Sequence, residues 1–226
     1  MTHEPTAKAF LLVGALLSVL FLYSLALDDS SRRSLLGEGG LVESATAAFY
    51  ILCIAFIVGV GKAAYARRHP DLLLLVVFFL LRELDFDKKF TAVGLLKARF
   101  FLSDSVPLGE KAIGAVLLLI LAAIGMSIIY RYSKRFWSGL RDRSIVSMGA
   151  LLSIGLLGVS QVLDGLPRKL KSLGFDPSHS AFLHTTAMEE ILELGIPLIL
   201  LLTFNAYFRR SSVISMLRTA PPSNGG

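Results

Sequence analysis

The sequence predicts an all-α protein, a polytopic integral membrane bundle of six transmembrane helices with an interfacial helix after the third span. Two observations predict this class. More than half of the 226 residues are hydrophobic (54%), and the mean hydropathy is +0.66. The charged residues, 18% of the chain, gather between apolar runs that approach the length a helix needs to cross a bilayer. We therefore treat residues 1–210 as one transmembrane domain.

Each predicted span is an apolar run bounded by charged or turn-forming residues. The flexible "GEGG" precedes the second span, the "RRHPD" turn precedes the third, and "SDSVP" offers capping residues before the fourth. The first run is long for a secretory signal, so we expect it to be retained. The chain ends in "APPSNGG", which predicts a disordered tail over 211–226. The predicted spans lie near residues 9–27, 41–62, 71–89, 111–130, 145–163 and 181–207.

The third span is unusual because its purely apolar stretch, residues 72–81, is short. Ten residues of helix cover about 15 Å, half of the hydrocarbon core. To cross the membrane, this helix must continue through "RELDFDKK". The next stretch, "FTAVGLLKARFF", places its large apolar side chains on one helical face, which predicts a helix lying in the membrane interface. These side chains are Phe90, Val93, Leu96, Phe100 and Phe101.

The charges indicate an orientation. With six spans, both termini share one face with the links at 62–71 and 131–144. Lys and Arg divide almost equally between the faces, but they form compact clusters on this one, so we expect cytoplasmic termini in a bacterial-type plasma (inner) membrane. Basic residues beside spans also explain the net charge of +6, so the expected partners are membrane lipids and not nucleic acid. The single cysteine, Cys53, excludes an internal disulfide.

Nearly all acidic residues lie on the opposite face, and several fall inside predicted spans. Residues three, four and seven apart share one face of a helix, so four of the spans each carry a polar stripe. In the sixth span Glu189 and Glu193 align, and in the third Arg82 and Asp85 form a predicted structural pair. The remaining stripes hold Glu43, Thr46 and Tyr50 in the second span and Ser153, Ser160 and Asp164 in the fifth.

Ionisable groups at membrane depth cost on the order of several kcal/mol unless they are paired or hydrated, so they usually face a functional interior. We expect the stripes to converge on one pocket that opens to the non-cytoplasmic face. Oxygen donors there favour Mg²⁺, Mn²⁺ or Ca²⁺, and Glu43, Glu189 and Glu193 are the candidate ligands of such a divalent cation. The expected catalytic residues are Glu43, Asp164, His184, Glu189 and Glu193, and the expected substrate-binding residues are Arg82 and Tyr50.

Three functions fit such a pocket. The first is a metal- or acid/base-dependent enzyme, for example a hydrolase, acting on a lipid-linked substrate. The second is an ion- or proton-coupled transporter, which the nearly unbroken apolar runs "LVVFF" and "PLILLLTF" disfavour. The third is an accessory membrane subunit without chemistry, whose acids form a solvated polar rim. The sequence holds no phosphate-binding glycine loop, no H-E-x-x-H and no G-x-S-x-G.

Overall fold

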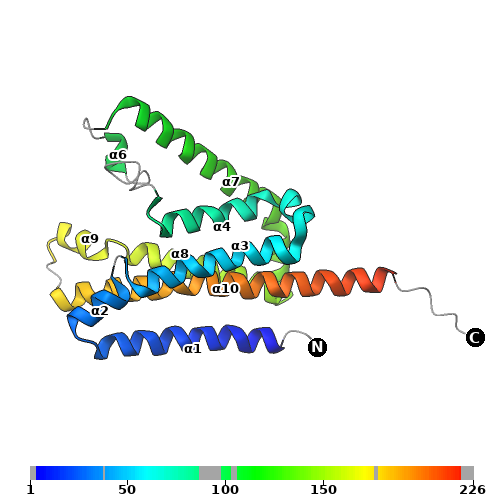
Figure 1. Cartoon of the computed structure of the whole chain (residues 1–226), viewed down its shortest axis with the longest axis horizontal. Coiled ribbons are helices and arrows are strands. Elements are labelled where there is room, and N and C mark those ends of the chain that lie inside the picture. The colour runs from blue at the N-terminus through cyan, green and yellow to red at the C-terminus, as the bar shows by residue number, and fades with distance from the viewer. Residues whose placement is uncertain (1–3, 38, 87–97, 103–105, 176–177, 220–226) are drawn as a thin grey trace, which may run out of the picture. The chain divides into compact units, whose positions relative to one another are not determined.

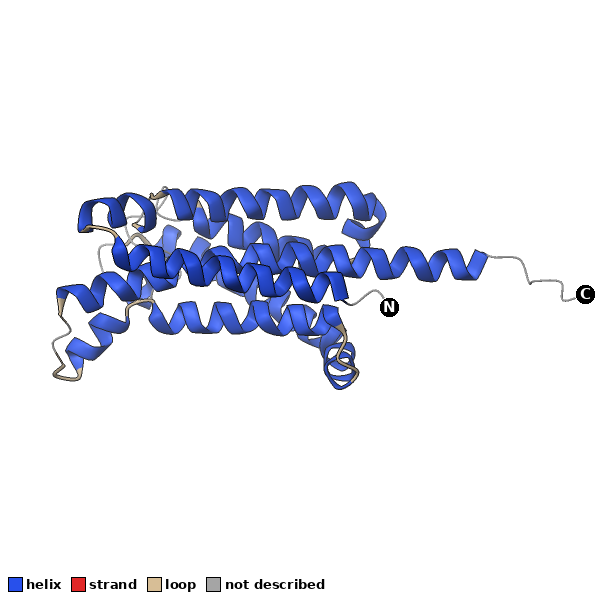
Figure 2. Cartoon of the chain, turned by 90° about the horizontal axis from the view of Figure 1, so that it is seen from below, coloured by secondary structure: helices blue, strands red, loops and turns tan. Residues whose placement is uncertain are grey.

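The computed structural model describes residues 4–37, 39–86, 98–102, 106–175 and 178–219. Every regular element in these ranges is a helix, so the all-α prediction is confirmed for them (Figures 1 and 2). The helices group into two compact units. We name Met1–Gly37 with Gly139–Gly226 the N/C unit, and Glu38–Ser138 the middle unit.

Five helical stretches of the described residues are long and apolar enough to cross a membrane. By length and composition they match five of the six predicted spans. The remaining predicted span, the third, near residues 71–89, is not among them. The five stretches are Pro5–Ala26, Asp29–Lys62, Leu108–Arg141, Ile145–Leu163 and Ser180–Arg210.

The N/C unit is built around its last helix. α10 (His179–Thr219) packs against α8 (Ile145–Leu163) and α1 (Glu4–Ala26), and α8 also contacts α1 (Figure 1). The short helices α2 (Asp29–Leu36) and α9 (Leu166–Ser172) contact α10 as well. α10 is therefore the element that every other helix of this unit touches.

Two glycines allow the three long helices of the N/C unit to approach closely. A Cβ atom on Gly195 of α10 would lie 2.7 Å from Leu17 Cδ1 of α1 and 3.0 Å from Leu156 Cδ1 of α8. A Cβ atom on Gly149 of α8 would overlap Thr203 Oγ1 of α10. Small residues at such contacts are typical of helices that associate within membranes.

The middle unit contains α3 (Leu41–Arg68), α4 (Pro70–Glu83), α6 (Ala98–Leu102) and most of α7 (Leu108–Arg141). α3 packs against α4. Within α3, Lys62 has a non-helical backbone with φ of 59°, so the regular part of this helix ends where the predicted second span ends. α7 is longer than the predicted fourth span because the basic stretch after residue 130 continues the same helix.

The end of α4 corrects the predicted third span. Leu84 closes the helix by donating its N–H to the Leu80 carbonyl, and Asp85 has a left-handed φ of 46°. The predicted continuation of the helix is therefore wrong at residues 84 and 85, and residues 87–89 lie outside the described ranges. The 14 residues of α4 cover about 21 Å, which is less than the hydrocarbon core.

Two further predictions concern the segment before the fourth predicted span and the segment after the sixth. Most of the predicted interfacial helix lies outside the described residues, and only Ala98–Leu102 is seen as a helix. Phe100 is fully buried by protein, whereas an interfacial helix would turn this side chain toward lipid. The disordered tail over 211–226 stays a prediction, although α10 extends as far as Thr219.

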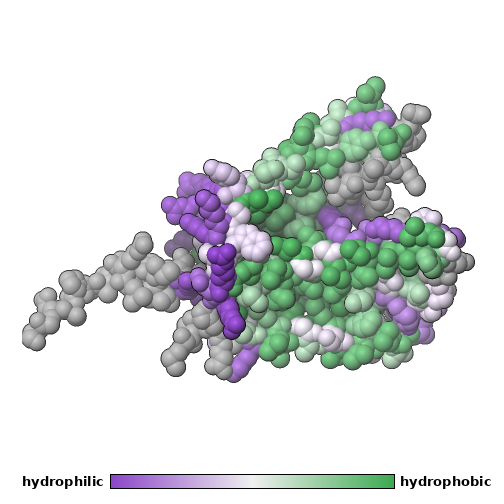
Figure 3. Space-filling model, turned by 180° about the vertical axis from the view of Figure 1, so that it is seen from behind, coloured by the Kyte–Doolittle hydropathy of each residue, from purple (hydrophilic) through white to green (hydrophobic). Residues whose placement is uncertain are grey.

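Hydrophobic side chains cover much of the surface. Only 6% of the most apolar stretch of α7 is buried inside the protein. Leu119 and Ile113 of this helix are 69% and 62% exposed. Figure 3 shows a face on which hydrophobic residues dominate. Soluble proteins rarely expose apolar patches of more than a few hundred Å². These surfaces are compatible with integration in a membrane.

Candidate functional site

The carboxylates of the predicted sixth span lie in the first half of α10. Glu189 and Glu190 are half-buried, whereas Glu193 is only 6% exposed. Glu189 and Glu193 are one turn apart and share a helical face. Over a single turn of α10, the acidic side chains therefore pass from the surface into the interior of the protein.

Beyond Glu193 the helix is apolar for more than two turns. Residues 194–202 carry no polar side chain, and residues 194–197 are all buried. The next polar residue, Thr203, donates its hydroxyl to the Ile199 carbonyl at 2.7 Å. Along α10, the polar side chains next to Glu193 therefore lie on its N-terminal side, at Glu189 and Glu190, and the C-terminal side is apolar.

His184, predicted as a catalytic residue, lies earlier in α10. Its Nδ1 atom is buried and, among the described residues, has no hydrogen-bond partner. At about 100° per residue, His184 is rotated by about 140° from Glu189 and by about 180° from Glu193. α10 by itself thus does not place the imidazole on the face that carries these two glutamates.

The polar stripe of α8 contacts its own helix. Ser153 Oγ donates to the Gly149 carbonyl at 3.1 Å, and Ser160 Oγ donates to the Leu157 carbonyl at 3.0 Å. Both serines are buried, so they serve as small residues in helix packing. Asp164 is exposed and is the residue that ends α8.

The stripe of α3 also has structural contacts. The Glu43 carboxylate accepts the Gly39 N–H at 2.5 Å, which satisfies a backbone donor next to the start of the helix. Thr46 donates its hydroxyl to the Val42 carbonyl at 2.9 Å. Tyr50 is 1% exposed and its ring lies 5.9 Å from that of Phe79 in α4.

Arg82 and Asp85 lie at the end of α4. The Asp85 N–H donates to the Arg82 carbonyl at 3.0 Å, so the backbone brings the two residues together in the turn that closes the helix. Both side chains are half-buried. Their predicted pairing through the side chains stays a prediction.

The predicted site residues are divided between the two units. Glu43, Tyr50, Arg82 and Asp85 belong to the middle unit. Their convergence with the remaining predicted residues of the N/C unit stays a prediction, as does a cation held jointly by Glu43, Glu189 and Glu193. In the part of the chain that the structure describes, no group of three or more His, Cys, Asp or Glu residues is arranged to hold a metal ion.

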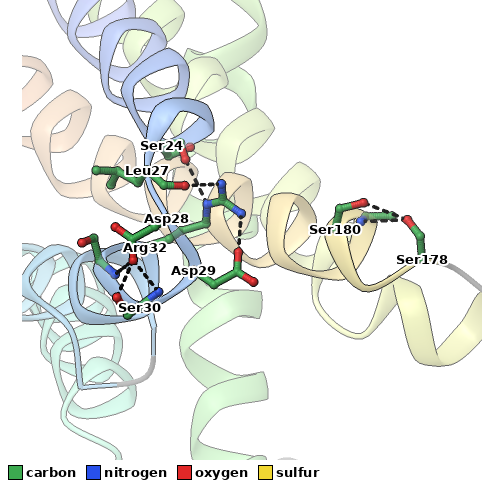
Figure 4. Close-up of polar contacts among 10 residues, drawn as sticks. Ser24, Leu27, Asp28, Asp29, Ser30, Arg32, Ser178 and Ser180 are labelled. Carbon is green, nitrogen blue, oxygen red and sulfur yellow. Dashed lines mark hydrogen bonds and ion pairs between the residues drawn. The ribbon is translucent and has the colours of Figure 1, made fainter.

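Sequence reasoning missed a buried arginine in the N/C unit. Arg32 is 7% exposed, and its guanidinium donates to the Ser24 carbonyl at 2.9 Å and to the Leu27 carbonyl at 2.8 Å (Figure 4). A third nitrogen lies 3.5 Å from Asp29 Oδ1. Arg32 thereby satisfies carbonyl groups at the end of α1, which have no partner within that helix.

Asp28 holds the start of α2 beside Arg32. Its carboxylate accepts the backbone N–H groups of Ser30 and Ser31 at 3.0 and 3.1 Å. Hydrogen bonds from Ser30, and then from Ser31, hold the pKa of Asp28 well below its usual range. The sequence "LDDSSRR" does contain this signal, since an aspartate ahead of a polar helical turn is a typical N-cap.

A second missed cluster lies in the middle unit around Asp71, which is 5% exposed. Its carboxylate accepts hydrogen bonds from Ser127 Oγ at 3.0 Å, Arg131 Nη1 at 3.1 Å and the Tyr132 hydroxyl at 3.2 Å. The three donors come from α7, more than fifty residues later in the chain, in and beside a stretch predicted to be a link. Local sequence patterns do not report a pairing at such a separation.

Comparisons with known proteins found no family model, curated protein or solved structure that matches this chain. The site and its chemistry are therefore the basis for any function assigned to the chain.

Proposed function

We propose that this protein is an integral membrane enzyme whose carboxylates on α10 act on a lipid-linked substrate. The observation that carries the proposal is the graded burial of these carboxylates, from half-buried Glu189 and Glu190 to Glu193 at 6% exposed. A carboxylate at membrane depth is costly, and such residues are usually kept for a function. The apolar residues 194–202 that follow favour a site open at one side over a transport path.

Depth along the helix supports a role for Glu193 in proton transfer. Within the candidate span Ser180–Arg210, Glu193 lies about 20 Å from Ser180, near the middle of the stretch. Two nearby carboxylates in a medium of low dielectric constant do not both ionise readily. Acid/base catalysis needs one proton donor and one proton acceptor near the leaving group, and we assign these roles to Glu193 and Glu189. A divalent cation shared by Glu189 and Glu193 is the alternative way to hold both charges.

We also infer six crossings of the membrane, and the supporting contacts lie within the middle unit. Arg131 of α7 contacts both the end of α3 at Arg68 and the start of α4 at Asp71. Leu108, where α7 begins, is about 35 Å away from Arg131 along the helix. The chain must therefore travel about one bilayer thickness between Asp71 and Leu108, which supports a crossing there even though α4 alone is too short.

The accessory-subunit alternative has one specific observation in its favour. Ser153, Ser160 and Thr46 each donate to a carbonyl of their own helix, and Glu43 accepts a backbone N–H. Much of the polarity that first indicated a pocket therefore has a structural use. Glu193 differs from these residues because it is a carboxylate in the interior and away from a helix end.

A comparison of membrane lipids tests the proposed enzyme. Cells producing the wild type, Glu193→Gln or the exposed control Asp142→Asn at equal levels are compared by mass spectrometry of extracted lipids and lipid-linked intermediates. Relative to cells without the protein, we expect the amount of at least one lipid species to change in cells that produce the wild type or Asp142→Asn. We expect no such change in cells that produce Glu193→Gln. Identical lipid profiles for the wild type and Glu193→Gln would contradict the proposal. In isolated membranes, a chelator stops the change only if the site works through a cation.

A further inference from the structure

A second group of charges, in the middle unit, is not used by the proposed enzyme site. Arg68 ends α3, and three basic residues follow the apolar part of α7. We name these residues the cationic surface: Arg68, Arg131, Lys134 and Arg135. All four are exposed, and the only acidic side chain that contacts any of them in the described structure is Asp71.

Asp71 fixes the cationic surface in place but neutralises only one of its charges. Arg131 Nη1 lies 3.1 Å from Asp71 Oδ2, and Arg131 Nη2 donates to the Arg68 carbonyl at 2.8 Å. The Arg131 side chain is 39% exposed, whereas that of Asp71 is 5% exposed. One guanidinium therefore joins α3, α4 and α7, while the carboxylate is enclosed by its donors and is closed to other cations.

Lys134 and Arg135 lie three and four residues after Arg131 in α7, so the three cations share one side of that helix. Several of these charges act on His69. The pKa of His69 is lowered first by its burial and then by the charges of Arg131, Arg68 and Arg135, against the opposing charge of Asp71. Arg68, Lys134 and Arg135 form no ion pair in the described structure, which leaves an excess of positive charge there.

The position along α7 places the cationic surface at the height of lipid headgroups. The apolar stretch of α7 ends at Tyr130, and the basic residues begin at the next position. Tyr130 and Trp137 are 86% and 64% exposed. Tyrosine and tryptophan are enriched where the hydrocarbon core meets the headgroups, and the apolar face of α7 before them is open to acyl chains.

We propose that the cationic surface binds the phosphate of an anionic phospholipid headgroup. Guanidinium groups donate two parallel hydrogen bonds to phosphate oxygens, and a third cation lengthens the surface over which a headgroup can be held. Clusters of Lys and Arg at the edge of a span attract anionic lipids in this way. A zwitterionic headgroup carries the same phosphate, but its own cation is repelled by the uncompensated arginines. The proposal is independent of the carboxylate site on α10.

The test is a lipid titration of the purified full-length chain in a neutral detergent. Phosphatidylglycerol is added to the wild type, Arg68→Gln, Arg135→Gln and the control Arg33→Gln, and the midpoint of thermal unfolding is followed. Arg33 is an exposed arginine of α2, so its substitution removes the same charge elsewhere. Arg131 is left intact because it anchors Asp71. Phosphatidylcholine and soluble glycerol phosphate serve as the two comparison ligands.

We expect a saturable rise of the unfolding midpoint with phosphatidylglycerol in the wild type and in Arg33→Gln. In Arg68→Gln and Arg135→Gln the half-saturating concentration rises roughly fivefold for each charge removed, and salt weakens the effect. Equal titrations for Arg33→Gln and the two surface variants would overturn the proposal, as would an equal rise with phosphatidylcholine. A response to glycerol phosphate as strong as that to the lipid would show a free-phosphate site and would also overturn it.

Discussion

Single polar residues within the helices fall into two groups. Hydroxyls such as those of Ser153, Thr46 and Thr203 donate to a carbonyl of the preceding turn, which satisfies them without a partner on another helix. The periodicity of these residues was visible in the sequence, but a polar stripe and a stripe of small packing residues have the same spacing. Glu193 is distinguished because it is a carboxylate buried as deeply as these hydroxyls, and no local pattern reveals that burial.

At the residue scale, we predict that Gly149→Ala destabilises the N/C unit. The added methyl group would overlap Thr203 Oγ1 and lie 2.9 Å from Phe10 Cζ, and overpacking of this kind costs about 1–3 kcal/mol. Gly155→Ala in the same helix meets no atom within 4 Å and is the matched control. Thermal unfolding in detergent measures the difference. Equal unfolding midpoints for the two variants would show that α1, α8 and α10 do not meet at Gly149.

The pH dependence at His69 is a second prediction at this scale. Burial and the nearby Arg131 lower its pKa below the usual 6.5, so the folded protein holds a neutral imidazole. The unfolded chain binds a proton more readily, and the stability that depends on neutral His69 is present above pH 6.5 and is lost as the pH falls below it. Arg68, Arg135, Asp71 and the Tyr132 hydroxyl also face this ring.

Unfolding midpoints measured between pH 7.5 and pH 5.5 test this assignment. The wild type should lose stability toward pH 5.5, and His69→Gln, which cannot take up the proton, should lose less. If both proteins respond equally, the titrating group lies elsewhere.

At the scale of helices, the sequence predicted where apolar runs begin and end better than where helices end. α8 covers Ile145–Leu163, as predicted, because polar residues and the left-handed Gly165 bound it. α7 extends past Tyr130 because Arg and Lys favour helix as strongly as apolar residues do. Hydropathy indicates where the hydrocarbon core of a membrane ends, whereas a helix ends where its backbone leaves helical φ and ψ angles. α4 ends at Glu83 through the left-handed Asp85, which no glycine or proline announces.

The contact between α4 and α7 yields a prediction at this scale. Arg131→Gln removes the charge that faces buried Asp71, and a buried group that loses its charged partner costs about 1–3 kcal/mol. Arg141→Gln, an exposed arginine in the last turn of the same helix, is the control and should change stability little. The free energy of unfolding in a denaturant titration gives the comparison. A loss of equal size in both variants would remove the Asp71–Arg131 pair as a stabilising contact.

At the scale of the whole molecule, the sequence predicted an all-helical membrane protein because hydropathy is a property of each segment. Which helices are neighbours depends on contacts between distant segments, such as Gly149 with Thr203 or Asp71 with Arg131, and these leave no periodic signal. Helical periodicity, in contrast, places Glu189 and Glu193 on one face of a helix from the sequence alone. The partners of that face could not be predicted in this way.

Topology is the prediction that belongs to this scale. With Cys53 replaced by alanine, single cysteines at Ser34, Ser138 and Ser172 are labelled in intact cells by a membrane-impermeant thiol reagent. Six crossings place Ser34 and Ser172 on the outer side and Ser138 on the cytoplasmic side. Labelling of Ser138→Cys from the same side as Ser172→Cys would contradict this arrangement.

The central claim is that α10 carries an interior carboxyl group, that of Glu193, reached from one side of the membrane. An apolar carbodiimide, which enters apolar surroundings and modifies carboxyl groups there, tests it most directly when the modified residues are mapped by mass spectrometry. We predict modification of Glu193 in wild-type membranes, little reaction of Glu193 with a water-soluble carbodiimide, and no modification at this position in Glu193→Gln. A Glu193 that resists the apolar reagent, or that reacts equally with the water-soluble one, would contradict the account.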